Sequence, residues 1–74
     1  MNTYAYLNAV LDDHPSIVRL VLNPAAYAIA SGEVPAGERD IRTRVTLEEA
    51  APDAVPGLCV GYDVNDAIIA QFYC

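Results

Sequence analysis

The sequence predicts an α+β fold in which short N-terminal helices precede a small antiparallel β-sheet of about three strands. Three observations support this fold class: helical spacing of apolar residues near the N-terminus, a period of two from Asp40, and two apolar runs after Gly57. The chain has 74 residues, of which 54% are apolar, and neither repeats nor a linker interrupt it. We therefore expect a single domain covering residues 1–74.

The first helix is predicted from Tyr4, Leu7 and Leu11, which recur at the three- and four-residue spacing of one helical face. Thr3 is the expected N-cap. The helix should end by Asp13, because the next residue precedes a proline and is directed out of helical geometry.

Residues 16–22 are compatible with either a buried helix or a strand, because they are rich in β-branched residues but start after a proline. We predict a helix here. The next signal is clearer: Asn23 as N-cap and Pro24 in the first turn predict a helix through Ser31, with Gly32 as its C-terminal cap.

A strand is predicted from residue 41 to residue 48, where apolar or β-branched side chains alternate with polar ones. A competing interpretation begins at Thr46, because Thr46 and Glu49 have the spacing of a capping box that could open a single helical turn.

The last two apolar runs, residues 58–64 and 67–73, are predicted to form a hairpin with Asn65-Asp66 as a two-residue turn. In that register the facing pairs are Val64 with Ala67, Tyr62 with Ile69, Val60 with Gln71, and Cys59 with Phe72. The alternative is a final helix capped by Asp63, with Val64, Ile68 and Phe72 on one face.

Cys59 and Cys74 lack the spacing and the histidine partners of a zinc site. The chain also has no basic N-terminal segment of a secretory signal, so we expect a complete cytoplasmic protein. In that reducing compartment the two cysteines are predicted to remain thiols. No apolar run approaches the roughly 20 residues of a membrane helix, so no membrane association is expected.

No group of residues in the sequence indicates a reaction. His14 is the only histidine, and its neighbours Asp12 and Asp13 do not supply the geometry of an acid–base dyad. The acidic surroundings of Cys59 would raise the pKa of a thiol rather than activate it. No metal-loop or phosphate-loop spacing is present either. We therefore expect neither an enzyme, nor a metal site, nor a cofactor.

The formal net charge is −6, and four arginines supply every positive side chain besides the histidine. Such a surface repels phosphate backbones, so direct nucleic-acid binding is disfavoured and a basic protein surface is the expected partner. Arg39, Arg42 and Arg44 are predicted to pair with acids on neighbouring strands. Residues 46–74 contain no base but five carboxylates, which should lie together on one exposed side.

Five tyrosines offer large contact areas at low entropic cost. Tyr4 and Tyr6 cannot both point into the core from one helix, so one of them, or Tyr62 or Tyr73, is available as an interface anchor. The candidate partner-binding residues are Glu33, Glu38, Asp40, Glu48, Glu49, Asp53, Asp63, Asp66 and Tyr62.

In size and charge profile, carried by the eight carboxylates just named, the chain resembles the small phage-encoded inhibitors of bacterial immunity, in particular anti-CRISPR proteins. The resemblance implies a non-catalytic inhibitor in the host cytoplasm that imitates DNA charge and blocks a Cas subunit or surveillance complex. The expected state is a monomer or small oligomer. The alternative is a structural or assembly protein of a phage particle, in which Tyr4, Tyr6 and the hairpin edge form lateral contacts.

Overall fold

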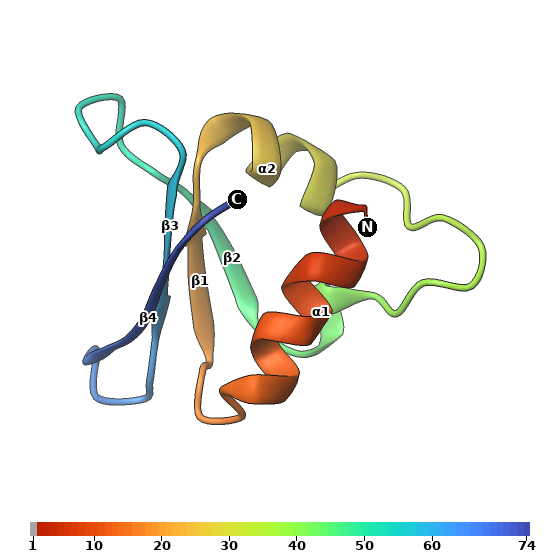
Figure 1. The fold of residues 1–74 in the computed structure, drawn as a ribbon, viewed down its shortest axis with the longest axis horizontal. Helices are drawn as coiled ribbons and strands as arrows, with labels where there is room; N and C mark the ends of the chain where they lie inside the picture. Colours follow the sequence, from red (N-terminus) through yellow and green to blue (C-terminus); the bar gives the residue numbers. More distant parts are fainter. Residues whose placement is uncertain (1) are drawn as a thin grey trace.

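The computed structural model describes residues 2–74, and its elements follow the predicted α+β order (Figure 1). The sheet has the strand order β2-β1-β3-β4, with four strands rather than three. The elements are α1 (Thr3–Asp13), β1 (Arg19–Leu22), α2 (Pro24–Ala30), the 3-10 helix η1 (Ile41–Thr43), β2 (Thr46–Glu49), β3 (Leu58–Tyr62) and β4 (Ile68–Tyr73).

Two of the three predicted helices are confirmed, as α1 and α2. Tyr4, Leu7 and Leu11 are buried on one face of α1, as their spacing indicates. The N-cap of α1 is Asn2 rather than Thr3, because the Asn2 side chain accepts a hydrogen bond from the Ala5 amide at 2.8 Å. In α2, the Asn23 side chain caps the helix by accepting from the Ala26 amide at 3.0 Å.

The helix predicted for residues 16–22 is wrong, because Arg19–Leu22 form the strand β1. Its side chains alternate: Leu20 and Leu22 are fully buried, whereas Arg19 and Val21 lie on the opposite face and are half-buried. β1 pairs with β2 on one side and β3 on the other. Hydrogen bonding to two neighbours outweighs the local ambiguity of this segment.

The strand predicted for residues 41–48 is correct only at its end, where Thr46–Glu49 form β2. Residues 41–43 form η1 instead, with the Asp40 carboxylate accepting from the Arg42 amide at 3.0 Å. Ile41 and Val45 are both buried, and their spacing of four fits a helical turn as well as an alternating strand. The capping-box interpretation of Thr46 is also wrong, because Thr46 begins β2.

The sheet is mixed, not antiparallel as predicted. β1 and β2 run parallel, with Leu20 opposite Leu47, whereas β1–β3 and β3–β4 are antiparallel. A parallel pair requires a crossover connection, which α2, the 31–40 loop and η1 provide.

The C-terminal hairpin is confirmed, and the alternative final helix is wrong. Two predicted pairs are observed, Val60 with Gln71 and Cys59 with Phe72. A bulge near Gly61 and Tyr62 moves Tyr62 opposite Ile68 instead of Ile69.

The turn of this hairpin has three residues between Asp63 and Ala67, not two, and the Asp63 amide donates to the Ala67 carbonyl at 3.0 Å. Within this turn, only Asp66 adopts a positive φ, of 61°. A two-residue type I′ turn would require positive φ at two successive residues, so the longer loop confines the strain to one.

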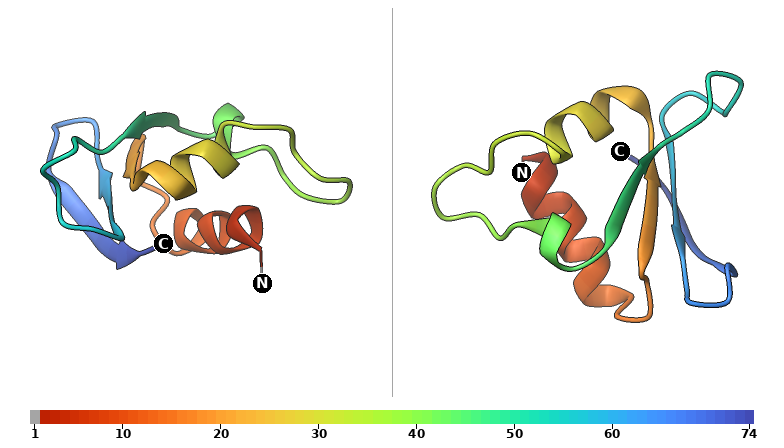
Figure 2. Two further views of the ribbon diagram at one scale, coloured as in Figure 1. Left: turned by 90° about the horizontal axis from the view of Figure 1, so that it is seen from above. Right: turned by 180° about the vertical axis from the view of Figure 1, so that it is seen from behind.

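Both helices cover the same face of the sheet, and the 31–40 loop extends away from it on the helix side (Figures 1 and 2). The core lies between these two layers and contains Tyr4, Leu7, Leu11, Ile17, Leu20, Leu22, Ala26, Ala30, Ile41, Val45 and Cys59. A Cβ atom at Gly61 would lie 2.5 Å from Cδ1 of Ile17, so the absence of a side chain there lets Ile17 pack onto β3.

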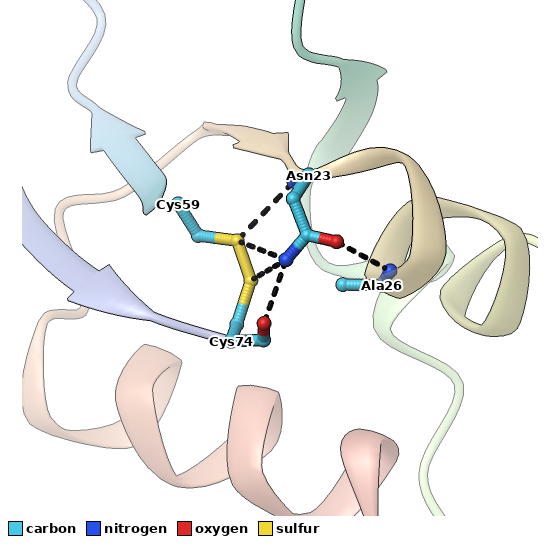
Figure 3. The surroundings of a disulfide bond; sticks show 4 residues. All are labelled: Asn23, Ala26, Cys59 and Cys74. Carbon is cyan, nitrogen blue, oxygen red and sulfur yellow. Dashed lines mark hydrogen bonds between the residues drawn. A yellow bond between two sulfur atoms is a disulfide. The ribbon is translucent and has the colours of Figure 1, made fainter. Parts of the chain in front are cut away.

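Cys59 and Cys74 form a disulfide, and the prediction that both remain thiols is wrong. Their Cα atoms are 6.0 Å apart, within the usual range for a disulfide, because Cys74 follows β4 directly and lies diagonally opposite Cys59. The buried Asn23 side chain contacts the bond and donates to the Cys74 carbonyl at 2.6 Å (Figure 3). Asn23 thereby joins the start of α2 to the end of β4.

We expect reduction of this disulfide to lower the free energy of unfolding by about 3 kcal/mol. The two cysteines are 15 residues apart in sequence, and without the bond the unfolded chain gains the conformational freedom that this loop had lost. Urea unfolding with and without a reductant measures the difference. The double variant Cys59→Ala/Cys74→Ala is the control, since its midpoint should not respond to reductant. An unchanged midpoint for the reduced native protein would contradict this expectation.

Candidate protein-binding surface

The face of the sheet opposite the helices is open in the part of the chain that the structure describes (Figure 2). Strand register assigns its side chains, because residues opposite each other on paired strands share a face. One row contains Glu48, Val21, Val60 and Gln71; a second contains Thr46, Arg19, Tyr62 and Ile68; a third contains Leu58 and Tyr73. We call these ten residues the open face.

The centre of the open face is apolar. Val21, Leu58 and Val60 are half-buried by their neighbours, while Ile68 and Tyr73 on β4 are 53% and 72% exposed. Contiguous apolar area that is rimmed by polar groups is typical of protein-binding surfaces. Of the ten open-face residues, only Glu48, Tyr62 and Tyr73 were predicted from the sequence as contacts for a partner. Strand register is needed to place the other seven on the same side.

Arg19 organises the polar part of the open face. Its guanidinium forms ion pairs with Glu48 on β2 and with Asp66 in the β3–β4 turn, the latter at 3.1 Å. The same group lies over the Tyr62 ring, with Cζ 4.2 Å from the ring centroid. The hydrogen bond that Arg19 donates to Glu48 is the largest of the causes that raise the pKa of Arg19. This arginine was not identified as a site residue from the sequence, although it stands alone in an apolar segment.

The three central arginines do pair with carboxylates, but not on neighbouring strands as predicted. Arg39 and Arg44 both bind Asp12 at the end of α1, at 2.8 and 2.9 Å. Arg42 binds Asp40, two residues away, at 2.9 Å. The two pairs with Asp12 hold the connection between α2 and β2 against α1, and none of the three pairs involves a residue of the open face.

The hydrogen bonds that Arg39 and Arg44 donate to Asp12 lower the pKa of Asp12, and the bond from Arg39 has the larger effect. The hydrogen bond that Arg42 donates to Asp40 likewise lowers the pKa of Asp40. In each case the charged partner favours the ionised carboxylate.

The eight predicted partner-binding carboxylates do not lie together. Asp40, Glu48 and Asp66 have arginine partners. Glu38 accepts from the Asn2 side chain at 2.8 Å, and Asp63 accepts two amides within its own turn. The remaining three are exposed at separate places: Glu33 after α2, Glu49 at the end of β2, and Asp53 in the β2–β3 connection.

The expectation of one continuous acidic side in residues 46–74 is therefore wrong. The β2–β3 connection and the β3–β4 turn project from opposite ends of the sheet (Figure 1). Within residues 2–74, all four arginines form ion pairs, and the carboxylates without one are Asp13, Glu33, Glu38, Glu49, Asp53 and Asp63. Carboxylates consequently flank the open face at both ends of the sheet.

Tyr4 and Tyr6 do not both point into the core, as their positions on α1 predict. Tyr4 is buried, and its hydroxyl lies 2.6 Å from the Ile29 carbonyl and 3.0 Å from that of Glu33, so it is not an interface anchor. Tyr6 packs against Phe72 on the helix side of the sheet, with ring centroids 5.9 Å apart. Tyr73 is the most exposed of the tyrosines that the sequence analysis proposed as anchors.

The groups considered for catalysis lie apart from one another. His14 is exposed at the end of α1, and Cys59 is buried in the disulfide. A hollow of about 180 Å³ lies between Asn23, Pro24 and the 50–56 connection. It is smaller than the roughly 300 Å³ at which small-molecule pockets begin. Among residues 2–74, no cluster of three or more His, Cys, Asp or Glu side chains could hold a metal ion.

Comparisons with protein-family models, curated proteins and solved structures found no match to this chain. Among the described residues, no helix has both the length and the apolar character required to cross a bilayer.

Acid should weaken the fold through Asp12 and Asp40. Because their folded pKa values lie below the unfolded ones, their stabilisation is present above about pH 4 and is lost as the pH falls further. In Asp12→Asn/Asp40→Asn, we expect a lower urea midpoint near neutral pH and a shallower decline below about pH 4.

Urea midpoints measured from neutral pH to about pH 2 test this expectation. The matched control is Asp53→Asn, which changes a loop carboxylate without an ion pair in the described residues. An acid decline of the double variant parallel to that of the native protein would contradict the role of the two pairs.

Proposed function

We propose that this chain is a non-catalytic binding protein that captures a cationic protein through the open face of its sheet. The observation that carries the proposal is a sheet covered by helices on one side only, with an apolar centre on the other side and carboxylates at both ends. This arrangement matches the usual anatomy of a protein interface, an apolar centre within a polar rim.

The charge of the molecule supports a cationic partner. Within residues 2–74 every arginine is already paired and six carboxylates have no ion pair, in a chain of net charge −6. Three of the six, Glu49, Asp53 and Asp63, lie at the ends of the sheet. Opposite charge accelerates encounter at low ionic strength and does so less as salt screens it. The apolar centre of the open face would then supply the contact that persists in salt.

We propose that the partner is a nucleic-acid-binding surface of a bacterial defence complex, such as a Cas subunit, because such a surface is basic and this chain is acidic. Because the carboxylates lie at separate ends of the sheet, the proposed inhibition works by covering a basic groove, not by imitating a row of phosphates. The proposal places this inhibitor in the host cytoplasm. The disulfide weighs against that location, since disulfides persist mainly in oxidising compartments.

The test measures target-DNA binding by purified RNA-guided defence complexes in the presence of the chain. Val60→Lys places a cation at the apolar centre, and we expect it to weaken inhibition at least about tenfold. Ala25→Lys is the matched control, because it adds the same charge at an exposed position of α2 on the helix side. Circular dichroism establishes that both variants are folded.

A second variant, Glu49→Gln/Asp53→Asn/Asp63→Asn, should inhibit with a weaker dependence on salt than the native chain. Equal losses in Val60→Lys and Ala25→Lys would show that net charge alone matters and would overturn the role of the open face. Absence of inhibition for every complex tested would overturn the proposed class of partner.

A further inference from the structure

The free edge of β4 supplies an inference that does not depend on the proposed function. In the order β2-β1-β3-β4, which covers the strands of residues 2–74, β4 has a neighbouring strand on one side only. Its sequence, IIAQFY, contains neither a charged residue nor a proline, which commonly protect edge strands from pairing. We propose that β4 pairs antiparallel with β4 of a second copy of this chain, forming a two-fold symmetric dimer with one continuous sheet.

The main chain of β4 is oriented for this pairing. The Cys74 amide donates to the Gly57 carbonyl at 3.1 Å, so this end of the segment bonds toward β3. Bonding direction alternates along an antiparallel strand, and the amide and carbonyl groups of Gln71 and Tyr73 therefore point away from β3. They form the edge that a second strand would meet.

The side chains fit a two-fold axis at Gln71. In that register Gln71 lies opposite Gln71 of the second copy, and Tyr73 lies opposite the bulge at Ile69 of the second copy. A glutamine amide is both donor and acceptor, so two identical glutamines can bond to each other. Tyr73, which is 72% exposed in the single chain, shares the open face with Gln71 and gains Gln71 of the second copy as a diagonal neighbour. The bulge bends β4 only at its turn end, before Ala70.

The end of β4 is held in place before any partner arrives. The disulfide ties Cys74 to β3, and Asn23 donates to the Cys74 carbonyl at 2.6 Å. An edge that is already ordered loses less conformational entropy on pairing than a free segment would.

A second copy suits this edge better than a cationic protein does. Residues 67–74 carry no charged side chain, so a cationic partner would find no side-chain carboxylate on β4. Two copies of this acidic chain can approach along the same edge without placing like-charged side chains against each other. A standard interface buries about 800 Å² per partner, nearly a fifth of the 4397 Å² surface of this chain. A single strand edge buries less, so we expect association in the micromolar range or weaker.

Sedimentation equilibrium over a wide range of concentration tests the proposal. We expect a monomer–dimer equilibrium that high salt preserves or strengthens, because salt screens the repulsion between two chains of charge −6. Gln71 is exposed on the edge, and Gln71→Lys would place two lysines opposite each other at the two-fold axis. This variant should weaken dimerisation at least about tenfold. Thr46→Lys is the matched control, because it adds the same charge to the exposed side of the other edge strand.

Amide hydrogen exchange of the native chain gives a second measurement that needs no variant. The Gln71 and Tyr73 amides should become more protected as concentration rises, while amides of β2 should not. A monomer at every concentration, loss of association in Thr46→Lys but not in Gln71→Lys, or open-ended growth beyond a dimer would each overturn the proposal. Since salt should weaken capture of a cationic protein but not this dimer, failure of one proposal is distinguishable from failure of the other.

Discussion

The position of β1 between β2 and β3 is the constraint on which the rest of the structure depends. This four-residue strand is bonded on both sides and directs Leu20 and Leu22, both fully buried, toward the helices. Because α2 begins directly after β1, the helix layer is placed on the leucine side. The other face of β1 carries Arg19 and Val21. Because side chains alternate along the strand, these two residues point to the side of the sheet that no helix covers.

The sequence was most informative where structure is local. The cap formed by Asn23 and the face of Tyr4, Leu7 and Leu11 are determined by residues within one or two turns, and both were predicted. The fate of residues 16–22 was not, because partners in β2 and β3 decide it. Likewise the spacing of Ile41 and Val45 suits a strand and a helical turn equally, and only tertiary packing selects between them.

The candidate site was predictable in composition but not in arrangement. Net charge indicates an acidic surface, yet it does not say which carboxylates neutralise the arginines. Asp12, at the end of α1, takes two arginines from the connection before β2, whereas the predicted acids on β2 and the hairpin meet only Arg19. Ion pairing across the chain is a property of topology, and the parallel β1–β2 pairing that determines it was not foreseen.

The left-handed backbone of Asp66 places two demands on one residue. A φ of 61° costs a non-glycine residue roughly 1 kcal/mol or more, and glycine would adopt it freely. Glycine, however, would leave Arg19 with a single carboxylate beside the apolar centre of the sheet. The turn thus tolerates a conformational penalty and gains a second carboxylate beside Arg19. Replacing Asp66 by glycine would remove the penalty but would also remove one negative charge beside the open face.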